Sequence, residues 1–351
     1  MSGVFTYANP PVIRWGVGSL AELPADVARL GGTRVAVVTT RSLAADAASL
    51  LRLPEAPVAT VVIGQHAPIA EVERGAEAVA EAGANALVSL GGGSPIDAAK
   101  VIGRLAVERA GAPERVLPHV AVPTTLSVAE LASGAGVTDA GGDKVGRRDP
   151  RMLPSEVIYD GALAVRTPLD LWLSTGIRAL DHAVESYLAD GEHPFSDVLG
   201  LEAVRRLFAT LPLARARPDD ASVRCENQLA AWFSYTLPGP AAGGLSHTMG
   251  KQIGARHGIP HGVTSCLLLP HVMRYQAPRC GERLHELSRA TGSGGGALAA
   301  ADDVQRLIGE LGLPQHLASF GLGDAELRAA VESLSVPVPK DDLLAIYRAA
   351  L

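Results

Sequence analysis

The chain has 351 residues, which is long enough for two domains with cores of their own. Apolar residues make up 47% of it and charged residues 19%, as in an ordinary globular protein, and a net charge of −6 without any basic run argues against nucleic-acid binding. No apolar segment reaches the roughly 18 residues of a membrane span, no secretory signal is recognisable, and three cysteines show no pattern, so we expect a cytoplasmic protein without a membrane partner.

Up to about residue 165, short runs rich in β-branched residues alternate with alanine-rich stretches. Strands are expected at 34–40, 58–64, 86–93, 119–125 and 156–160. Helices are expected between them, at 69–83 and 95–111. This alternation predicts βαβ units and a parallel sheet.

After about residue 165 the strand pattern fades and amphipathic helices follow one another, at 176–189, 195–212, 221–236, 300–312, 324–334 and 340–350. The sequence therefore predicts a Rossmann-like α/β nucleotide-binding domain over residues 1–163 and an all-helical domain over residues 164–351. A cleft between two such halves is a usual place for a small-molecule site, and we expect the active site there.

The stretch LGGGSPIDAAK, residues 90–100, places three glycines and a serine between a strand and a helix. Glycines let the backbone approach a pyrophosphate closely, and the start of a helix supplies free N–H groups and a partial positive charge. Asp97 and Lys100 fall on the first turns of that helix, where they could reach a ligand or cap the helix. A tight turn without a ligand is the alternative.

The stretch TGIRALDHAVESYL, residues 175–188, has apolar residues at helical spacing, which predicts a half-buried helix. Arg178, His182 and Glu185 lie three to four residues apart on it and therefore share one face. On a face toward solvent these residues need no explanation. On a face toward a cleft they are candidates for catalysis.

These stretches carry a resemblance to a known family. LGGGSPIDAAK resembles the phosphate-binding signature of the iron-containing alcohol dehydrogenase superfamily, FTYANPPVIRWGVGSL (5–20) its opening hairpin and turn, and GLSHTMGKQIGARHGIPHGVTSCLLLPHVMRY (244–275) its metal-and-catalysis segment. HAPIAEVERGAEAV (66–79) and KVGRRDPRMLPSEVIYD (144–160) are most similar to the maleylacetate reductase branch. The resemblance implies a dehydroquinate synthase-like architecture, a homodimer, and NAD(P)H-dependent reduction of a keto-diacid in aromatic-ring catabolism.

The metal-dependent members of the superfamily hold Fe²⁺ or Zn²⁺ with an aspartate, a histidine four residues later, and two histidines fourteen residues apart. This sequence keeps the three histidines, His182, His247 and His261, but has Arg178 at the position of the aspartate. A guanidinium has no lone pair to offer and repels a cation. Asp181 is expected to point about 100° away from His182 and so not to replace the missing ligand. We therefore expect no metal, although three histidines alone could still bind zinc.

A second cation stands in the predicted site, because Lys251 takes the position of a further histidine of the family. A guanidinium can hold a carboxylate with two parallel hydrogen bonds or stabilise an oxyanion. The resemblance thus implies a small anionic substrate held by Arg178 and Lys251, with His247 or His261 as the proton donor. The alternative is that both cations lie on a solvated surface.

The cofactor site implied by the resemblance includes the glycine turn, the end of the fourth strand and a lysine near the nicotinamide: Gly92, Gly93, Ser94, Asp97, Thr124, Thr125 and Lys144. Many relatives place an aspartate after VVTT that binds the adenosine ribose, where this chain has Thr40 followed by Arg41. Without that carboxylate NADPH is no longer repelled, and Arg41 could pair with its phosphate.

Two functions remain open at this stage. The first is reduction of the ketone of a small carboxylate by NADH or NADPH, which the intact glycine stretch favours. The second is a homologue that has given up hydride transfer and uses the same cationic, histidine-rich site for dehydration, decarboxylation or ring closure. The loop LSVAELASGAG (126–136) favours the second, because it keeps Glu130 but has Val128, Ala129 and Ala132 in place of the family's polar residues.

Overall fold

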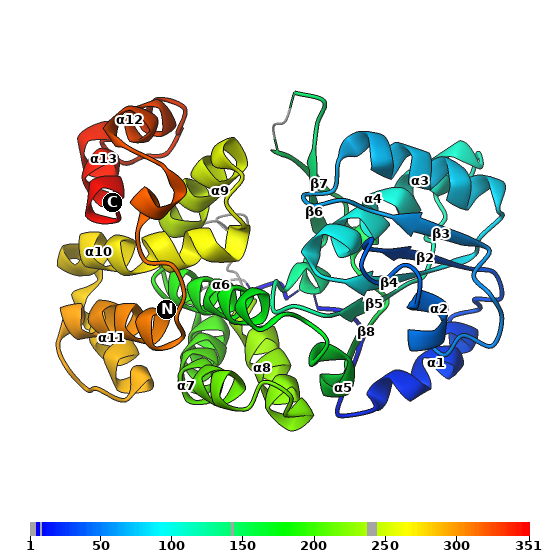
Figure 1. Ribbon diagram of the computed structural model, residues 1–351, viewed down its shortest axis with the longest axis horizontal. Coiled ribbons are helices and arrows are strands. Elements are labelled where there is room, and N and C mark those ends of the chain that lie inside the picture. The colour runs from blue at the N-terminus through cyan, green and yellow to red at the C-terminus, as the bar shows by residue number, and fades with distance from the viewer. Residues whose placement is uncertain (1–4, 8, 142–143, 237–243) are drawn as a thin grey trace. The chain divides into compact units, whose positions relative to one another are not determined.

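The computed structural model describes residues 5–7, 9–141, 144–236 and 244–351 (Figure 1). The chain divides into two compact units. One, the α/β unit, comprises Ala8–Thr167 and Asp220–Gln228; the other, the helical unit, comprises Met1–Tyr7, Pro168–Asp219 and Leu229–Leu351. The sequence predicted a single boundary, between residues 163 and 164. In the structure the segment that ends at Tyr7 belongs to the helical unit, and Asp220–Gln228 belongs to the α/β unit.

Six parallel strands form the sheet of the α/β unit. Their spatial order is β1 (Val12–Trp15), β8 (Glu156–Tyr159), β5 (His119–Pro123), β4 (Ala86–Gly91), β2 (Val35–Thr39) and β3 (Ala59–Val62). The predicted parallel sheet and its five predicted strands are confirmed. The remaining strand, β1, pairs in parallel with β8, so the described residues of the opening stretch do not form the hairpin that the resemblance suggested.

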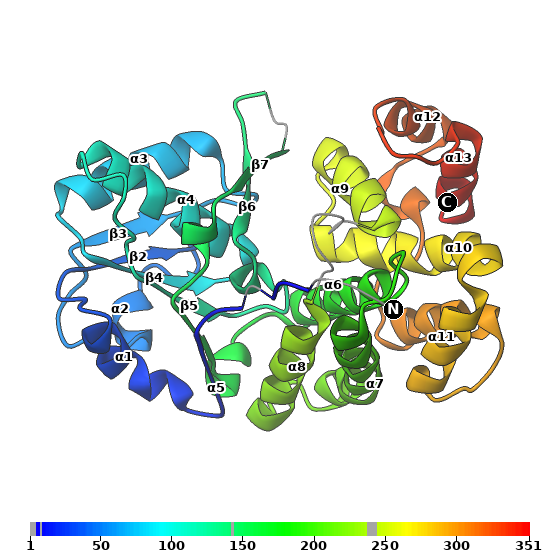
Figure 2. The ribbon, with the colours of Figure 1, turned by 180° about the vertical axis from the view of Figure 1, so that it is seen from behind.

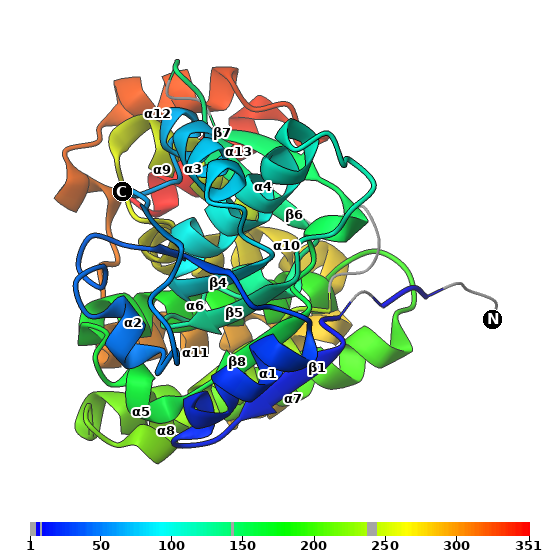
Figure 3. The same cartoon turned by 90° about the vertical axis from the view of Figure 1, so that its right-hand side faces the viewer.

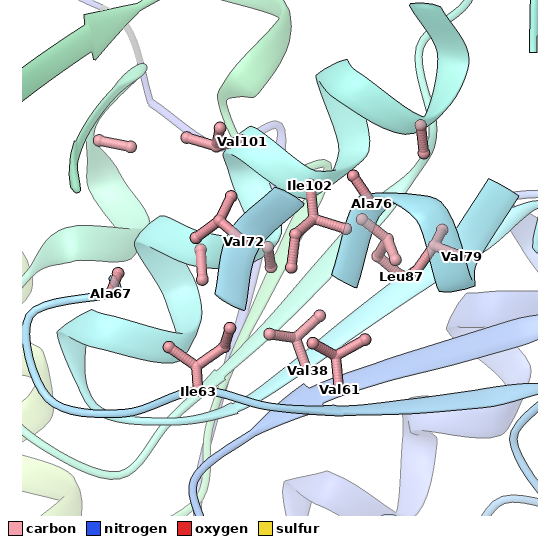
Figure 4. Close-up of a cluster of buried hydrophobic side chains, with 14 of the residues drawn as sticks. Val38, Val61, Ile63, Ala67, Val72, Ala76, Val79, Leu87, Val101 and Ile102 are labelled. Atoms are coloured by element: carbon pink, nitrogen blue, oxygen red, sulfur yellow. The ribbon is translucent and has the colours of Figure 1, made fainter. Parts of the chain in front are cut away.

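Helices cover both faces of this sheet, as a parallel sheet requires (Figure 3). On one face α3 (Ile69–Glu81) and α4 (Gly93–Arg109) pack against β2, β3 and β4 through the apolar cluster shown in Figure 4. On the other face lie α1 (Leu23–Arg29), α2 (Ala47–Leu50) and α5 (Gly161–Ala164). Neighbouring residues of one strand point to opposite faces of the sheet: Val38 packs in the cluster with α3 and α4, and Val37 in the cluster with α1, α2 and α5.

The strand order of the sheet reverses between β2 and β4. From β2 the chain continues to β3 at one edge, then returns to the other side of β2 and proceeds through β4 to β5. Open α/β sheets bind ligands outside the carboxyl ends of the strands at such a reversal. Thr39 and Gly91 end the two strands concerned, so the glycine turn lies at this point.

An antiparallel hairpin, β6 (Gly134–Thr138) and β7 (Lys144–Arg148), forms a second small sheet (Figure 2). The 3₁₀ helices of this unit are η1 (Ser19–Glu22), η2 (Ala129–Leu131) and η3 (Pro150–Met152). The sequence predicted no strands here, because β7 is mostly exposed and rich in glycine and arginine.

The remaining helices are α6 (Leu169–Tyr187), α7 (Pro194–Ala216), α8 (Ala221–Ser234), α9 (Leu245–His257), α10 (His261–Thr291), α11 (Ala297–Glu310), α12 (Asp324–Glu332) and α13 (Lys340–Ala349), with the 3₁₀ helix η5 (Leu317–Phe320). All eight predicted helices of the chain are present. No helix in the described part of the chain is long and apolar enough to cross a membrane.

Among the helices after Pro168, α9 and α10 were not predicted; in the α/β unit the short helices α1, α2 and α5 were also not predicted. Helix α9 is rich in glycine and polar residues, and α10 contains Pro270 and Pro278 and has non-helical backbone at Cys280. Residues of these types disfavour helix in isolation, so tertiary packing must stabilise both helices. Leu267, Leu268 and Val272 of α10 form an apolar core with Met249 and Ile253 of α9.

Candidate active site

The glycine turn joins β4 to α4 in a conformation that only small residues allow. Gly91 has φ +140°, and a Cβ atom there would lie 2.7 Å from Cγ of Pro95. A Cβ atom at Gly92 would lie 3.0 Å from Cγ2 of Thr125. Helix α4 begins at Gly93, and its N-cap residue Gly92 has no side chain to accept a hydrogen bond from the first N–H groups, which can therefore bind an anion.

Two hydroxyl groups at the carboxyl end of β5 face this turn. Thr125 lies against Gly92, and Oγ of Ser127 lies 3.2 Å from the position of a Cβ atom at Gly93. Neither Oγ1 of Thr125 nor Oγ of Ser127 has a hydrogen-bond partner within the described residues, although both atoms are buried. Ser127 was not among the cofactor residues predicted from the sequence. It directly follows the PTTL stretch, in the loop that we expected to have lost its polar groups.

Of the other predicted cofactor residues, Ser94 and Thr124 have hydrogen-bond partners within the chain. Oγ of Ser94 accepts a hydrogen bond from the backbone N–H of His66 (3.0 Å). Thr124 is buried, and its carbonyl accepts a hydrogen bond from the hydroxyl of Thr167 (2.6 Å). Thr40 and Arg41 follow β2, and the side chain of Arg41 is exposed. Lys144 begins β7, and its side chain lies outside the part that the structure describes.

Asp97 and Lys100 of α4 hold the loop that follows β5. The buried ammonium of Lys100 donates to the carbonyls of Ala129 (2.5 Å) and Gly134 (2.8 Å) and to Oδ1 of Asp97 (3.3 Å). Oδ2 of Asp97 accepts from the backbone N–H of Gly136 (2.9 Å). These contacts fasten the loop to the helix that carries the glycine turn.

Glu130 is the buried acid of the same loop. Its Oε1 accepts a hydrogen bond from the hydroxyl of Tyr159 (2.9 Å), and burial raises the pKa of Glu130 to about 7. Val128, two residues earlier, has φ +56°, a left-handed conformation that is unusual and strained for a β-branched residue.

In the helical unit, the guanidinium of Arg178 is buried and is surrounded by polar side chains. Arg178, on α6, is 3% exposed. Its Nη1 donates to Oδ2 of Asp181 (3.0 Å) and Oγ of Ser265 (3.0 Å), and its Nη2 donates to Nε2 of His247 (3.2 Å). The solvated alternative for Arg178 is therefore wrong. Burial lowers the pKa of Arg178, but a guanidinium titrates so far above neutrality that it stays protonated.

Asp181 belongs to this cluster, which the sequence argument did not anticipate. Its Oδ2 accepts hydrogen bonds from Arg178, from Oγ of Ser265 (2.6 Å) and from Oγ of Ser246 (3.1 Å). Asp181 therefore balances the positive charge of Arg178. A residue three positions along a helix lies near the same face, and this spacing lets Asp181 pair with Arg178.

Glu185 holds the start of α9. Its carboxylate accepts hydrogen bonds from the backbone N–H groups of Ser246 (2.6 Å) and His247 (3.2 Å). Burial raises the pKa of Glu185 well above its ordinary value, and the charge of Asp181 adds to this effect. A Cβ atom at Gly244 would lie 2.1 Å from Cδ of Glu185, so a larger residue there would displace this carboxylate from the start of α9.

The structure brings the three predicted histidines together. The ring centroids of His182 and His247 are 5.6 Å apart, and those of His247 and His261 are 5.1 Å apart. Burial, and the charge of Arg178, lower the pKa of His182 well below its ordinary value, so this ring is neutral. Lys251 is half-buried on α9, one turn after His247.

Close contacts of glycine residues explain how three helices approach so tightly. A Cβ atom at Gly262, beside His261, would lie 2.8 Å from the backbone carbonyl carbon and oxygen of Ser174 on α6. A Cβ atom at Gly250 would lie 2.8 Å from Oγ1 of Thr264 on α10. The glycines of the stretch 244–262 were the sequence signal for this packing. The catalytic and binding roles assigned to these residues stay predictions.

Comparisons with known proteins agree in both halves of the chain. The family described as iron-containing alcohol dehydrogenase matches residues 10–161, and the C-terminal part of the Fe-containing alcohol dehydrogenase family matches residues 172–350. Maleylacetate reductase from Rhizobium sp. (strain MTP-10005) is 30% identical over 333 residues, which cover 93% of this chain and 90% of the relative. Maleylacetate reductase 2 from Cupriavidus pinatubonensis is 33% identical over 298 residues, 83% of this chain and 79% of the relative.

Solved structures agree as well. The crystal structure of the Rhizobium maleylacetate reductase matches with a TM-score of 0.85 at 29% identity, covering 99% of this chain and 97% of the other. A sulfoacetaldehyde reductase from Bifidobacterium kashiwanohense, in complex with NAD⁺, matches with a TM-score of 0.88 at 25% identity, covering 99% of each chain.

Proposed function

Because this chain belongs to the iron-containing alcohol dehydrogenase family, we propose that it reduces the ketone of a small anionic keto acid with NADH or NADPH, as a maleylacetate reductase does. The chain is an NAD(P)-dependent oxidoreductase, as its family and its relatives indicate. The class of substrate and the independence of metal are inferred from its own residues.

The observation that carries the proposal is the buried guanidinium of Arg178 beside His247. The described residues occupy three of its five N–H groups, which leaves two for a substrate carboxylate or a developing oxyanion. Lys251, on the same face of α9 as His247, adds a second cation. A site of this kind favours an anionic substrate over a neutral alcohol or aldehyde.

The arrangement of this cluster argues against a metal ion. A histidine must offer a lone pair to a metal, and Nε2 of His247 is not available because it already accepts an N–H group of Arg178. Among the described residues, no three or more histidine, cysteine, aspartate or glutamate side chains are arranged to hold a metal ion. We therefore propose that the reaction needs no metal, although the family is named for iron.

The glycine turn, by contrast, fits a dinucleotide. The open N–H groups of α4 suit a pyrophosphate, and the unpartnered hydroxyls of Thr125 and Ser127 suit polar atoms of a cofactor. A bound nicotinamide, when reduced, supplies the hydride. The chain's own part is to bind the cofactor through this turn and to bind and polarise the keto acid through the cluster around Arg178.

The proposed function is tested with purified protein dialysed against a chelator. We expect oxidation of NADH or NADPH on addition of maleylacetate or a related keto-diacid, no loss of activity after dialysis, and a higher melting temperature with cofactor. One tightly bound iron or zinc ion per chain, required for turnover, would contradict metal independence. If neither reduced cofactor raises the melting temperature and none is oxidised, the proposed reduction is refuted and acid–base chemistry without hydride transfer is favoured.

The cofactor preference is tested at Arg41, which stands after β2 where relatives carry an acidic residue. Arg41→Ala should weaken binding of NADPH by about 1–3 kcal/mol, because a charged hydrogen bond to the 2′-phosphate is lost, and should leave NADH unchanged. Dissociation constants for both cofactors provide the measurement, with Arg109→Ala, an exposed arginine at the end of α4, as control. Equal losses for both cofactors would show that Arg41 does not contact the phosphate.

A further inference from the structure

The contact between Arg178 and His247 decides where the protons of the imidazole lie. Nη2 of Arg178 and Nε2 of His247 are 3.2 Å apart. A guanidinium has donors only and does not give up a proton at any ordinary pH, so Arg178 must be the donor. Nε2 of His247 must then be the acceptor, with its lone pair directed at the guanidinium and no proton of its own.

The ring must therefore be neutral, with its single proton on Nδ1. An imidazolium would place a second N–H against the N–H of Arg178 and a second positive charge beside the first. We propose that Arg178 locks His247 as the neutral Nδ1–H tautomer, and that this N–H is the hydrogen-bond donor that polarises the ketone oxygen of the substrate. Neutral imidazole is able to act as such an electrophile. This inference deepens the proposed function and rests on it.

The partners of Arg178 and His247 hold both side chains in place. Asp181 and Ser265 both accept from Nη1, which orients the guanidinium so that Nη2 meets the imidazole. Glu185 binds the backbone N–H of His247 at the start of α9. Asp181 and Glu185 are thus positioning residues, one for the donor and one for the acceptor of the same hydrogen bond.

Nδ1 of His247 is the atom left for the substrate. It is buried and has no hydrogen-bond partner within the described residues. A buried N–H group without a partner is costly, and a carbonyl oxygen that accepts from it removes that cost. This is an independent reason to place the ketone oxygen at Nδ1 rather than at Nε2.

The proposal also assigns the proton. Hydride from NADH or NADPH forms a new C–H bond at the ketone carbon, the π electron pair of the C=O bond moves to oxygen, and the hydrogen bond from Nδ1 stabilises the resulting alkoxide. His247 keeps its proton, because losing it would leave an imidazolate, and a water molecule supplies the proton of the alcohol. Of the two donors expected from the sequence, His247 is thereby excluded as the acid.

The test is a ¹⁵N NMR measurement on the full chain labelled at histidine, in which protonated and unprotonated ring nitrogens have distinct shifts. His247→Gln identifies the resonances of His247. We expect an unprotonated Nε2 and a protonated Nδ1 in the unchanged protein. An imidazolium, or a proton on Nε2, overturns the proposal.

Two variants test the cause. Arg178→Met removes the donor and should let the proton of His247 redistribute toward Nε2, whereas the control Arg215→Met, an arginine of α7 that binds the carbonyl of Leu311, should leave the tautomer unchanged. An unchanged tautomer in Arg178→Met overturns the role of Arg178. If that variant does not fold, the spectrum of the unchanged protein decides.

A complex with oxidised cofactor and maleylacetate tests the contact with substrate. The Nδ1 proton of His247 should move to lower field on binding, and an unmoved resonance in a saturated complex overturns the donor role. His247→Ala should lower kcat by about 10²–10³-fold, as the loss of one oxyanion donor does. If His247 is the neutral Nδ1–H tautomer but no keto acid is reduced, the inference about the tautomer holds and the proposed function fails. The two proposals can therefore be distinguished.

Discussion

Lys100 in the α/β unit and Arg178 in the helical unit are both buried cations with a carboxylate three residues away on the same helix. Lys100 uses all three of its N–H groups, and two of them bind backbone carbonyls. Arg178 binds only side chains and keeps two N–H groups in reserve. The first cation closes a loop, whereas the second remains open to a ligand.

The groups left without partners follow the same distinction. Beside Arg178 the unpartnered buried atoms include Nδ1 of His247 and Oδ1 of Asp181, which belong to side chains that bind the cation through their other polar atom. In the α/β unit the hydroxyls of Thr125 and Ser127 lie at the glycine turn, next to the loop that Lys100 fastens. Lys100, whose N–H groups are all in use, therefore positions a loop whose hydroxyl groups are available to a ligand. Arg178, which has N–H groups without a partner among the described residues, is itself a candidate for binding substrate.

The largest expected effect concerns the pair of Arg178 and Asp181. Arg178→Met and Asp181→Leu should each lower the free energy of unfolding by about 3–5 kcal/mol, because each leaves a buried charge without its partner. The double variant should recover much of that loss while activity stays low. Urea unfolding with a double-mutant cycle measures this coupling. Additive losses would show that the two charges do not depend on each other, and the exposed pair Arg289 and Glu286 serves as control.

Lys100→Met should lower the free energy of unfolding by about 3 kcal/mol, because two carbonyls and Asp97 lose a buried donor. The rise in melting temperature on adding cofactor should also shrink, since the loop that bears Ser127 is no longer fastened to α4. Arg109→Met, at the exposed end of the same helix, should change neither quantity. A full cofactor effect in Lys100→Met would separate this cation from the cofactor site.

Glu130, in the loop that Lys100 fastens, makes the stability of the protein depend on pH. Its pKa is raised by burial from 4.5 to about 7, so between these values the folded protein keeps a proton that the unfolded chain releases. The stability that this proton contributes is fully present below pH 4.5 and is lost as the pH rises through about 7. Glu130→Gln should remove this dependence and be more stable than the unchanged protein at pH 8.5, by on the order of 3 kcal/mol, with little difference at pH 4.5. Unfolding curves across this pH range provide the test, and parallel pH profiles for the two proteins would contradict it.

The smallest effect concerns strain in the same loop. Val128→Gly should lower the free energy of unfolding by only about 1 kcal/mol, because the relief of a left-handed conformation offsets much of the loss of a buried side chain. Val37→Gly, at an equally buried residue of the regular strand β2, should cost more, about 3 kcal/mol. Urea unfolding compares the two, and equal losses would show that Val128 stores no strain.

Local patterns in the sequence determined much of this protein. The alternation of short apolar runs with alanine-rich stretches predicted the parallel sheet, because strands buried on both faces require such runs. The glycine stretch 90–100 was found because its residue types and their spacing are unusual in themselves, whereas the three histidines were found through the resemblance to the family's ligand pattern. Arg178 was recognised as a departure because the family pattern sets an aspartate at that position.

Only the tertiary structure decided what surrounds those residues. Ser246, Ser265 and Glu185 converge on Arg178, Asp181 and His247 from three helices, two of which the sequence did not predict. Likewise, β1 pairs with a strand far along the chain, and the hydroxyl of Ser127 faces Gly93 across the carboxyl ends of two strands. Spacing along a chain determines which side chains share one helix or strand. Which of them meet across different elements depends on packing, and here glycine residues at the helix contacts allow that approach.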